Sequence, residues 1–317
     1  MEVVHTPVLL EETVRSLAPR KAGELMVDAT LGEGGHSFAF LDRYPDLRII
    51  GIDADRAIQE VARRRLNVFG DRICFYNRWS QDFFADFPQT MKRPDSILID
   101  LGVSSYHYEK GERGFSFRKD EALDMRIDVE RGIGAAELLK RLSERELADL
   151  IYRNAEERYS RRIARAIVEA RSFGAINSSA ALAELVVRAA PPAYRRGRRH
   201  PATKTFQALR IAVNGELSRL DELLCAALKV LEVGGRLAVI SFHSLEDRVV
   251  KNCFREKNRN CTCPPEAPIC NCGGRRAVRY LTRKPVVPSE DEIKGNPPSR
   301  GAKLRVVEKL LDEDKRV

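Results

Sequence analysis

A glycine-rich segment followed by an aspartate about 20 positions later is the feature of the sequence best suited to chemistry. Residues 28–36 read Asp-Ala-Thr-Leu-Gly-Glu-Gly-Gly-His and contain Gly34, Gly35 and His36. Glycines at such a turn let the backbone approach a ligand closely. Asp53 ends the next apolar run, where a carboxylate can accept hydrogen bonds from both hydroxyls of a ribose. The pattern predicts a nucleoside site, although an ordinary strand-to-helix turn followed by a helix cap would give the same residues.

The spacing of these glycines excludes the two common phosphate-binding motifs. Ser37 stands where the dinucleotide fingerprint G-x-G-x-x-G requires glycine, and no G-K-[ST] of a P-loop follows. A ligand with an adenosine end and no phosphates remains, and S-adenosylmethionine fits that description. Trp79, the only tryptophan of the chain, could stack on an adenine, although a lone tryptophan is more often a core residue.

Short apolar runs predict the strands that hold these residues. Five of them are rich in Ile, Leu or Val without clean alternation, which is typical of parallel strands buried on both faces. Before them, Thr6 as N-cap and Pro7 at the first helical position predict a short opening helix. The five runs cover residues 25–29, 48–52, 73–76, 96–101 and 236–242, and two further possible strands cover 277–282 and 304–309.

A long insertion separates the fourth and fifth predicted strands. Residues 102–235 far exceed the dozen or so that a crossover connection needs. A capping box at Ser143–Glu146 and apolar residues at helical spacing predict an all-helical insert. A long amphipathic helix over residues 206–231 then returns the chain to the sheet. We place the insert at residues 109–202 and the sheet domain at residues 1–108 and 203–317.

Basic residues are concentrated in the second part of the insert, in a chain of net charge +9. Clustered Arg and Lys displace counterions from a phosphate backbone, so a polyanion such as RNA is the expected partner. A solvated helical face would explain the same charges. The candidate RNA-binding residues are Arg162, Arg165, Arg195, Arg196, Arg198, Arg199 and Lys204.

Other patterns bear on location and on metal binding. No apolar run approaches the roughly 18 residues that a membrane span needs, so we expect no membrane partner. Seven cysteines, without a secretory signal, predict the reducing cytoplasm. Cys261, Cys263, Cys270 and Cys272 could surround a zinc ion. Their C-x-C spacing is unlike the usual C-x₂₋₄-C, and a reduced loop is the alternative.

Eight strings along the chain together resemble one family, the bacterial small-subunit ribosomal RNA methyltransferase H (MraW-like) family. The likeness runs from His5 to about Lys309. The strings are His5-Thr-Pro-Val, Gly34-Gly-His36, Asp100-Leu-Gly-Val-Ser-Ser105, Arg113-Gly-Phe-Ser-Phe-Arg118, Leu123-Asp-Met-Arg126, Ala155-Glu-Glu-Arg-Tyr159, His200-Pro-Ala-Thr-Lys-Thr-Phe-Gln207 and Ser241-Phe-His-Ser-Leu-Glu-Asp-Arg248.

The resemblance implies a class I S-adenosylmethionine-dependent methyltransferase: a Rossmann-like, seven-stranded, mostly parallel sheet with an inserted helical domain that helps to recognise RNA. It implies methylation of the exocyclic N4 of a cytidine in the decoding region of 16S ribosomal RNA, within the small ribosomal subunit. The cofactor contacts that it suggests are Gly34, Gly35, His36, Asp53, Trp79, Asp100 and His107.

This sequence departs from the family pattern at three places. Trp79 replaces a usual Phe and keeps an aromatic face. Tyr106-His107 replaces a usual Pro-Gln pair, so the contact of His107 is less secure. Glu121 stands where a Gly commonly precedes the Ala-Leu-Asp-Met stretch, which affects a local turn rather than the reaction.

Asp100 and His243 are the candidates for a direct part in methyl transfer. The lone pair of cytosine N4 is delocalised into the ring, and an acceptor for an N4 proton would localise it. Asp100 ends the fourth strand, where it serves mainly the cofactor, and His243 follows the fifth, where a purely structural part in the loop is the alternative. Phe115, Phe117 or Tyr106 could form a stacking wall for the target base or simply anchor the insert.

Two other functions remain compatible with the residues. One is a DNA or protein amine methyltransferase. The other is a basic RNA-binding assembly factor that keeps S-adenosylmethionine only as a structural ligand.

Overall fold

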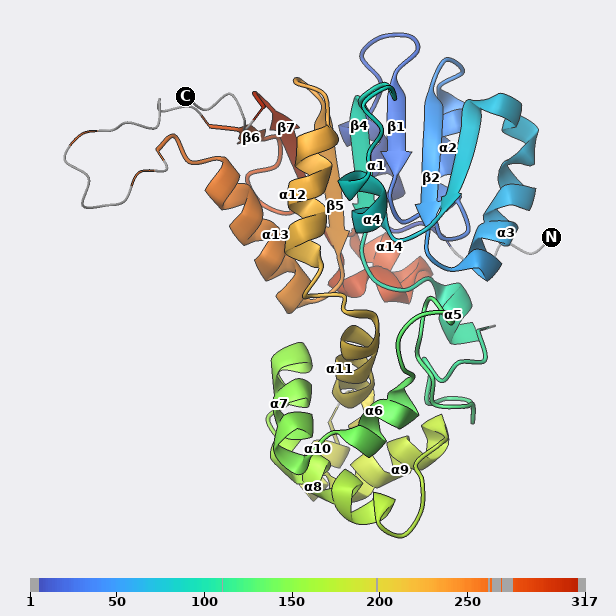
Figure 1. Cartoon of the computed structure of the whole chain (residues 1–317), viewed down its shortest axis with the longest axis vertical. Coiled ribbons are helices and arrows are strands. Elements are labelled where there is room, and N and C mark those ends of the chain that lie inside the picture. The colour runs from blue at the N-terminus through green and yellow to red at the C-terminus, as the bar shows by residue number, and fades with distance from the viewer. Residues whose placement is uncertain are drawn as a thin grey trace. The chain divides into compact units, whose positions relative to one another are not determined.

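All seven predicted strands form, and they join in one mostly parallel sheet (Figure 1). The strand order is β3-β2-β1-β4-β5-β7-β6, with β7 antiparallel to both of its neighbours. The predicted α/β fold is thereby confirmed. The strands are β1 (Leu25–Asp28), β2 (Arg48–Asp53), β3 (Ile73–Asn77), β4 (Ser96–Asp100), β5 (Arg236–Ser241), β6 (Val278–Tyr280) and β7 (Lys303–Lys309).

The computed structural model describes residues 6–109, 111–197, 199–261, 263, 269 and 276–312. The chain divides into two compact units. The sheet unit contains residues 1–102 and 219–317, and the helical unit contains residues 103–218. No helix in the described ranges is long and apolar enough to cross a lipid bilayer.

Helices cover both faces of the sheet, which explains why its strands lack polar alternation. Successive side chains of a strand point to opposite faces. Ile97 and Ile99 of β4 pack in the core under α4, α12 and α13, whereas Leu98 packs in the core under α1, α2 and α3. The helical segments of this unit are α1 (Leu10–Ser16), α2 (Gly35–Arg43), α3 (Arg56–Leu66), α4 (Ser80–Ala85), α12 (Leu220–Val230), α13 (Ser244–Lys257) and α14 (Glu290–Gly295), with 3₁₀ turns η1 (Asn67–Arg72) and η2 (Pro297–Gly301).

The opening helix begins later than predicted. Thr6 is not its N-cap, because α1 starts at Leu10, after Leu9 in a left-handed conformation. The Leu9 N–H donates to Oε1 of Glu292 on α14 (2.7 Å), a partner almost at the other end of the chain. A long-range hydrogen bond therefore replaces the local cap that the sequence suggested.

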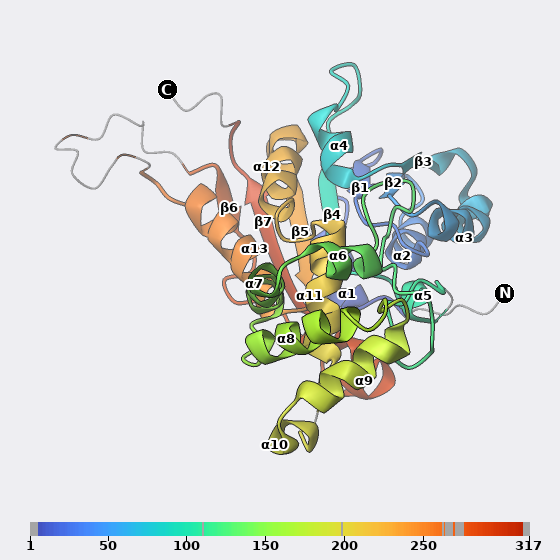
Figure 2. The same ribbon diagram turned by 60° about the horizontal axis from the view of Figure 1, so that its bottom comes forward.

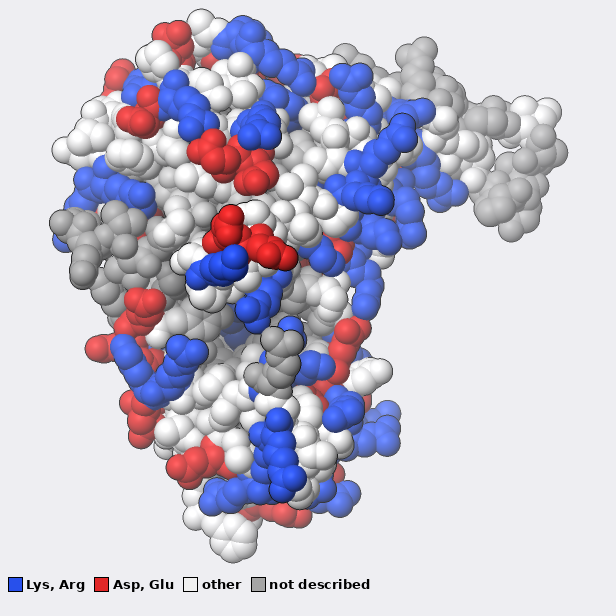
Figure 3. All heavy atoms as spheres, turned by 180° about the vertical axis from the view of Figure 1, so that it is seen from behind, with Lys and Arg blue, Asp and Glu red and all other residues white. Residues whose placement is uncertain are grey.

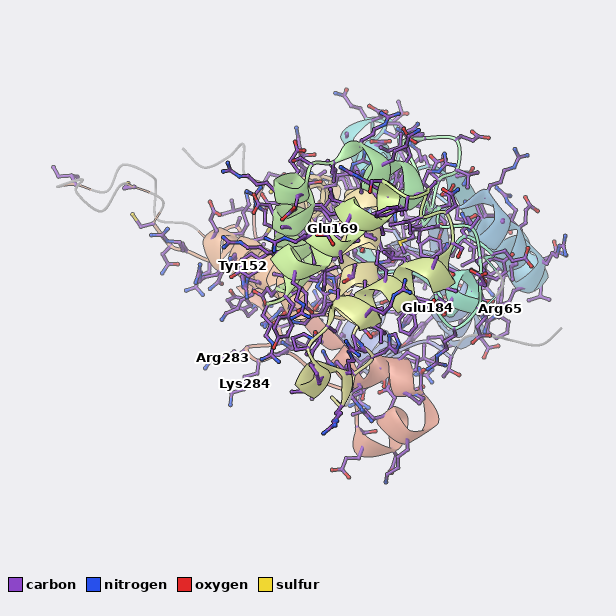
Figure 4. The ribbon with its side chains drawn as sticks, turned by 90° about the horizontal axis from the view of Figure 1, so that it is seen from below. Arg65, Tyr152, Glu169, Glu184, Arg283 and Lys284 are labelled. Carbon is purple, nitrogen blue, oxygen red and sulfur yellow. The ribbon has the colours of Figure 1, made fainter. Side chains whose placement is uncertain are left out.

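The helical unit has its own apolar core, which includes Leu147, Ile151, Ile163 and Ile167. The predicted capping box forms, since Ser143 Oγ accepts from the Glu146 N–H and the Glu146 carboxylate accepts from the Ser143 N–H. Figure 4 labels exposed side chains on three of its helices, Tyr152, Glu169 and Glu184. The helices are α5 (Ser105–Glu109), α6 (Ala135–Arg141), α7 (Glu144–Ala155), α8 (Ser160–Arg171), α9 (Ser179–Ala189), α10 (Pro192–Arg195) and α11 (Thr203–Asn214).

The predicted helix over residues 206–231 is wrong, because two helices occupy this stretch. Gly215, with φ +62°, ends α11 in the left-handed conformation, and α12 starts at Leu220. α11 packs against α7 and buries Phe206 and Leu209 in the core of the helical unit. The helical unit thus extends to residue 218, beyond the boundary at residue 202 that we placed from the sequence.

Candidate active site

Three strand-end aspartates mark the carboxyl edge of the sheet where the strand order reverses. From β1 the chain builds β2 and β3 on one side, and β4 and β5 lie on the other. Asp28, Asp53 and Asp100 are the last residues of β1, β2 and β4. Open α/β sheets bind their ligands in the crevice outside the carboxyl ends of the strands at such a switch point.

The glycine loop is constrained mainly by contacts within the protein. A Cβ on Gly34, which has φ +75°, would lie 2.7 Å from the Leu66 side chain. A Cβ on Gly35 would lie 2.5 Å from Cγ of Pro7. The loop therefore packs closely on α3 and on the segment before α1, and a side chain at either glycine would clash there.

Asp53 holds the glycine loop through its carboxylate. Oδ2 accepts from the Gly32 N–H (2.8 Å), and Oδ1 accepts from the Asp55 N–H (2.8 Å). Asp55 is the residue that caps α3, since its side chain accepts from the Ala57 N–H.

His36 connects the loop to the end of β4. Its buried ring places Nε2 3.1 Å from the carbonyl oxygen of Val8 and Nδ1 3.7 Å from Oδ2 of Asp100. A carbonyl only accepts, so Nε2 carries the proton and Nδ1 faces the carboxyl group. The structure thus brings His36 and Asp100 together.

Asp100 has a strongly perturbed environment. Burial raises its pKa well above the ordinary value, and the carboxylates of Asp28 and Glu246 raise it further. The side chain is 17% exposed, but its Oδ1 is fully buried and has no hydrogen-bond partner among the described residues. A buried acceptor without a partner is costly, and a ligand that carries a donor or a positive charge would satisfy it.

Asp28 was part of the glycine-rich string but was not predicted as a site residue. It is buried, and it accepts from the Ser37 hydroxyl (2.7 Å). Burial raises its pKa to about 6, against the opposing effect of this hydrogen bond. The signal that could have found it is its place at the end of a predicted strand, like Asp53 and Asp100.

Trp79 lies after β3 and precedes α4, half-buried at the carboxyl edge. The guanidinium of Arg219 lies 5.4 Å from the centre of its ring. The ring is therefore not a simple core residue, and one of its faces already has a cationic neighbour.

His243 caps helix α13. Its Nδ1 accepts from the Glu246 N–H (3.4 Å), and its Nε2 lies 3.0 Å from Oε1 of the same residue. Glu246 in turn accepts from the Phe242 N–H (2.8 Å). The cap is thus His243 rather than Ser244, and both ring nitrogens face Glu246. These contacts support the structural alternative for His243.

Glu246 is the second residue that the sequence did not single out. It is buried, it holds the loop after β5, and its charge raises the pKa of Asp100. Only its position within the Ser-Leu-Glu-Asp string could have pointed to it.

His107 and the aromatic candidates belong to the helical unit. The buried His107 ring lies 5.2 Å from the Phe115 ring. Phe117 stacks on His200 at 4.4 Å and meets Phe206 edge-on. Tyr106 lies 6.2 Å from His107. These rings contact one another, as the anchoring alternative predicts.

Five of the described basic candidates of the helical unit are exposed: Arg162, Arg165, Arg195, Arg196 and Arg199. Arg195 donates to the carbonyls of Ala190 and Arg188 at the end of α9, and Lys204 donates to the carbonyl of Glu156. Lys and Arg occur over much of the face shown in Figure 3, with Asp and Glu between them.

Several predicted residues fall outside the described part of the chain. Arg198 is one of them, as are Cys270 and Cys272 of the predicted zinc site. Cys261 and Cys263 are described, and both follow the end of α13.

Comparison of the sequence with those of known proteins assigns the chain to a family. The model of the MraW methylase family matches residues 2–310. Ribosomal RNA small subunit methyltransferase H of Treponema denticola is 54% identical over 310 residues, which cover 98% of both chains. The protein of the same name from Heliobacterium mobile is 45% identical over 314 residues, 98% of this chain and all of that one.

Proposed function

Because the chain belongs to the MraW methylase family, we propose that it methylates the exocyclic N4 of a cytidine in the decoding region of 16S ribosomal RNA. The observation that carries the proposal is the match of residues 2–310, which includes both the sheet unit and the helical unit. Relatives that are similar over 98% of this chain are named as small-subunit ribosomal RNA methyltransferases.

S-adenosylmethionine is the methyl donor, and it supplies a methyl group activated by a sulfonium charge. The residues at the switch point fit this group. Asp53 ends β2, where a carboxylate can accept hydrogen bonds from the hydroxyls of a ribose. Asp100 offers a buried oxygen without a partner among the described residues. Gly34, Gly35 and His36 would shape the pocket between them, Trp79 would contact the adenine, and His107 is a further proposed contact.

The environment of Asp100 suits the binding of a positively charged group. Its raised pKa means that the ligand-free carboxyl resists ionisation. A cationic ligand beside it would favour the carboxylate. As a carboxylate, Asp100 could also accept a proton from the attacking amino group. We therefore assign Asp100 to cofactor binding first and to the reacting amine second.

The helical unit is the proposed RNA-binding part. Its exposed arginines would neutralise phosphates, which positions the RNA without reading its sequence. Methylation at a ring-bound amino group requires the base to leave its stack, and the aromatic residues Tyr106, Phe115 and Phe117 are proposed to receive it. The small ribosomal subunit as partner and the cytoplasm as location belong to the same proposal.

Labelled methyl transfer tests the proposal. The purified protein would be incubated with methyl-labelled donor and, separately, small ribosomal subunits, free 16S ribosomal RNA and DNA. We expect label in ribosomal RNA as N4-methylcytidine, located by mass spectrometry at one decoding-region position that is unmodified in cells lacking the protein. Label in DNA alone would contradict ribosomal RNA as the substrate. Binding of the donor without methyl transfer to any of the three test substrates would indicate an RNA-binding assembly factor.

A further inference from the structure

Asp221, Cys225 and Cys253 form a cluster of metal-ligating side chains that the proposed methyl transfer does not use. One carboxylate oxygen and the two sulfurs all lie within 4.8 Å of one another. Asp221 and Cys225 are four residues apart and so share one face of α12. Cys253 comes from α13, which lies beside α12 in both ribbon views (Figures 1 and 2).

The cluster is separate from the candidate active site along α13. Cys253 lies about three turns further along this helix than the cap His243. Cys253 is buried, Cys225 is half-buried, and Asp221 is exposed in the first turn of α12. A small ion could therefore reach the three groups from the Asp221 side.

The two thiols are close enough to form a hydrogen bond. The hydrogen bond between Cys253 and Cys225 raises the pKa of Cys253 far above its ordinary value, and burial and the charge of Asp221 add to the effect. Lys257, one turn further on, acts weakly in the opposite direction. Three groups that repel one another when ionised are stabilised together by a dication, which displaces the thiol protons to solvent.

We propose that Asp221, Cys225 and Cys253 bind a zinc ion and thereby link α12 to α13. Two thiolates and one carboxylate are ligands that suit Zn²⁺ and not Mg²⁺ or Ca²⁺. Zn–S bonds of about 2.3 Å place neighbouring ligands of a tetrahedron roughly 3.7 Å apart, so the cluster needs only a small inward movement. Water would take the fourth position.

The test is a zinc titration of the full chain in which the other candidate ligands are removed. Cys261, Cys263, Cys270 and Cys272 are replaced together by serine. Isothermal titration calorimetry with Zn²⁺ is expected to give one equivalent bound per chain. Titration with Co²⁺ is expected to show the absorption of thiolate-to-metal charge transfer. Zn²⁺ is also expected to raise the melting temperature, since an ion that binds only the folded state stabilises it.

Two single variants on this background decide the assignment. Cys225→Ser and Asp221→Ala should each lower zinc affinity at least about tenfold and reduce the zinc-induced rise in melting temperature. Asp221 is exposed, so Asp221→Ala should fold even if Cys225→Ser does not. Glu222→Ala removes the neighbouring exposed acid of the same turn and should bind zinc like its parent. Absence of zinc uptake by the parent, or unchanged affinity in Asp221→Ala, would overturn the proposal.

Discussion

Three aspartates at equivalent strand ends have different properties because their neighbours differ. Asp53 has a backbone N–H on each oxygen. Asp28 is buried and accepts from the Ser37 hydroxyl and the Thr30 N–H, and Asp100 has one oxygen with no partner in the described structure. Desolvation disfavours the charged form, whereas hydrogen bonds to the carboxylate favour it. These differences suit Asp53 to hold neutral hydroxyls and Asp100 to pair with a cation.

Asp53→Asn should weaken donor binding. Replacing a carboxylate by an amide leaves one acceptor oxygen and weakens the charge-assisted hydrogen bonds, which are worth about 1.5–3 kcal/mol each. We expect the dissociation constant for S-adenosylmethionine to rise about 10- to 100-fold, measured by calorimetry. Asp46→Asn, at an exposed position before β2, is the matched control and should bind the donor normally. Equal affinities for the two variants would remove Asp53 from the site.

Asp28→Asn should change how stability depends on pH. The folded pKa of about 6 exceeds the usual 3.8, so the folded state binds more protons between these values. The contribution of Asp28 is therefore fully present below about pH 4 and is lost as the pH rises through 6. Relative to Asp28→Asn, the wild-type protein should lose roughly 3 kcal/mol between pH 4 and pH 7.

Urea unfolding of both proteins across this range measures the difference. Asn can still accept from Ser37, so the buried hydrogen bond is retained in the variant. Parallel pH profiles for the two proteins would show that Asp28 titrates normally.

At the scale of elements, α13 begins with a cap that uses an unusual residue. Ser, Thr, Asp and Asn are the common N-caps, yet the imidazole of His243 takes this role with Glu246 as its reciprocal partner. The same glutamate fixes the Phe242 N–H at the end of β5. The loop that follows β5 is thus held by the hydrogen bonds of the capping box.

His243→Asn separates a capping role from a role at the target base. Asn is among the best N-caps, so this variant should keep the melting temperature and should lower methyl transfer less than about threefold. His243→Ala should lose about 1 kcal/mol of stability, read from urea unfolding. If His243→Asn is stable but inactive with ribosomal RNA, the imidazole takes part in the reaction.

At the scale of the whole molecule, the chain has two units, and each buries apolar residues of its own. The sheet unit carries the strand-end aspartates, and the helical unit carries the exposed arginines that are proposed to bind RNA. Each unit buries its own apolar residues, so substitutions of surface charge in one unit should leave the other intact.

Replacing Arg162, Arg196 and Arg199 together by alanine should weaken RNA binding and leave donor binding unchanged. Each lost phosphate contact should reduce the slope of log affinity against log salt by about 0.7 to 0.9. Filter binding of ribosomal RNA at several salt concentrations measures this slope.

The matched control removes three exposed arginines of the sheet unit, Arg48, Arg64 and Arg283. It changes net charge by the same amount. A control that loses as much affinity as the helical-unit variant would show that RNA binds through overall charge alone.

The strands were predictable because their signal is local. A short run such as 96–100 is apolar at its three middle positions because both faces of the strand are buried, whatever lies above and below. The capping box of α7 was predictable for the same reason, since all its partners lie within four residues. The strand-end positions of Asp53 and Asp100 followed directly from the strands.

What the tertiary structure decided depends on partners far apart in the sequence. Thr6 loses its capping role because Glu292 binds the Leu9 N–H, and Gly35 is required because Pro7 packs on it. Asp100 differs from Asp53 because Asp28 and Glu246 surround it after folding. The sequence alone determined which strands form and which acids end them. Burial and electrostatics depend on distances in space, so only the folded chain could determine the state of each acid.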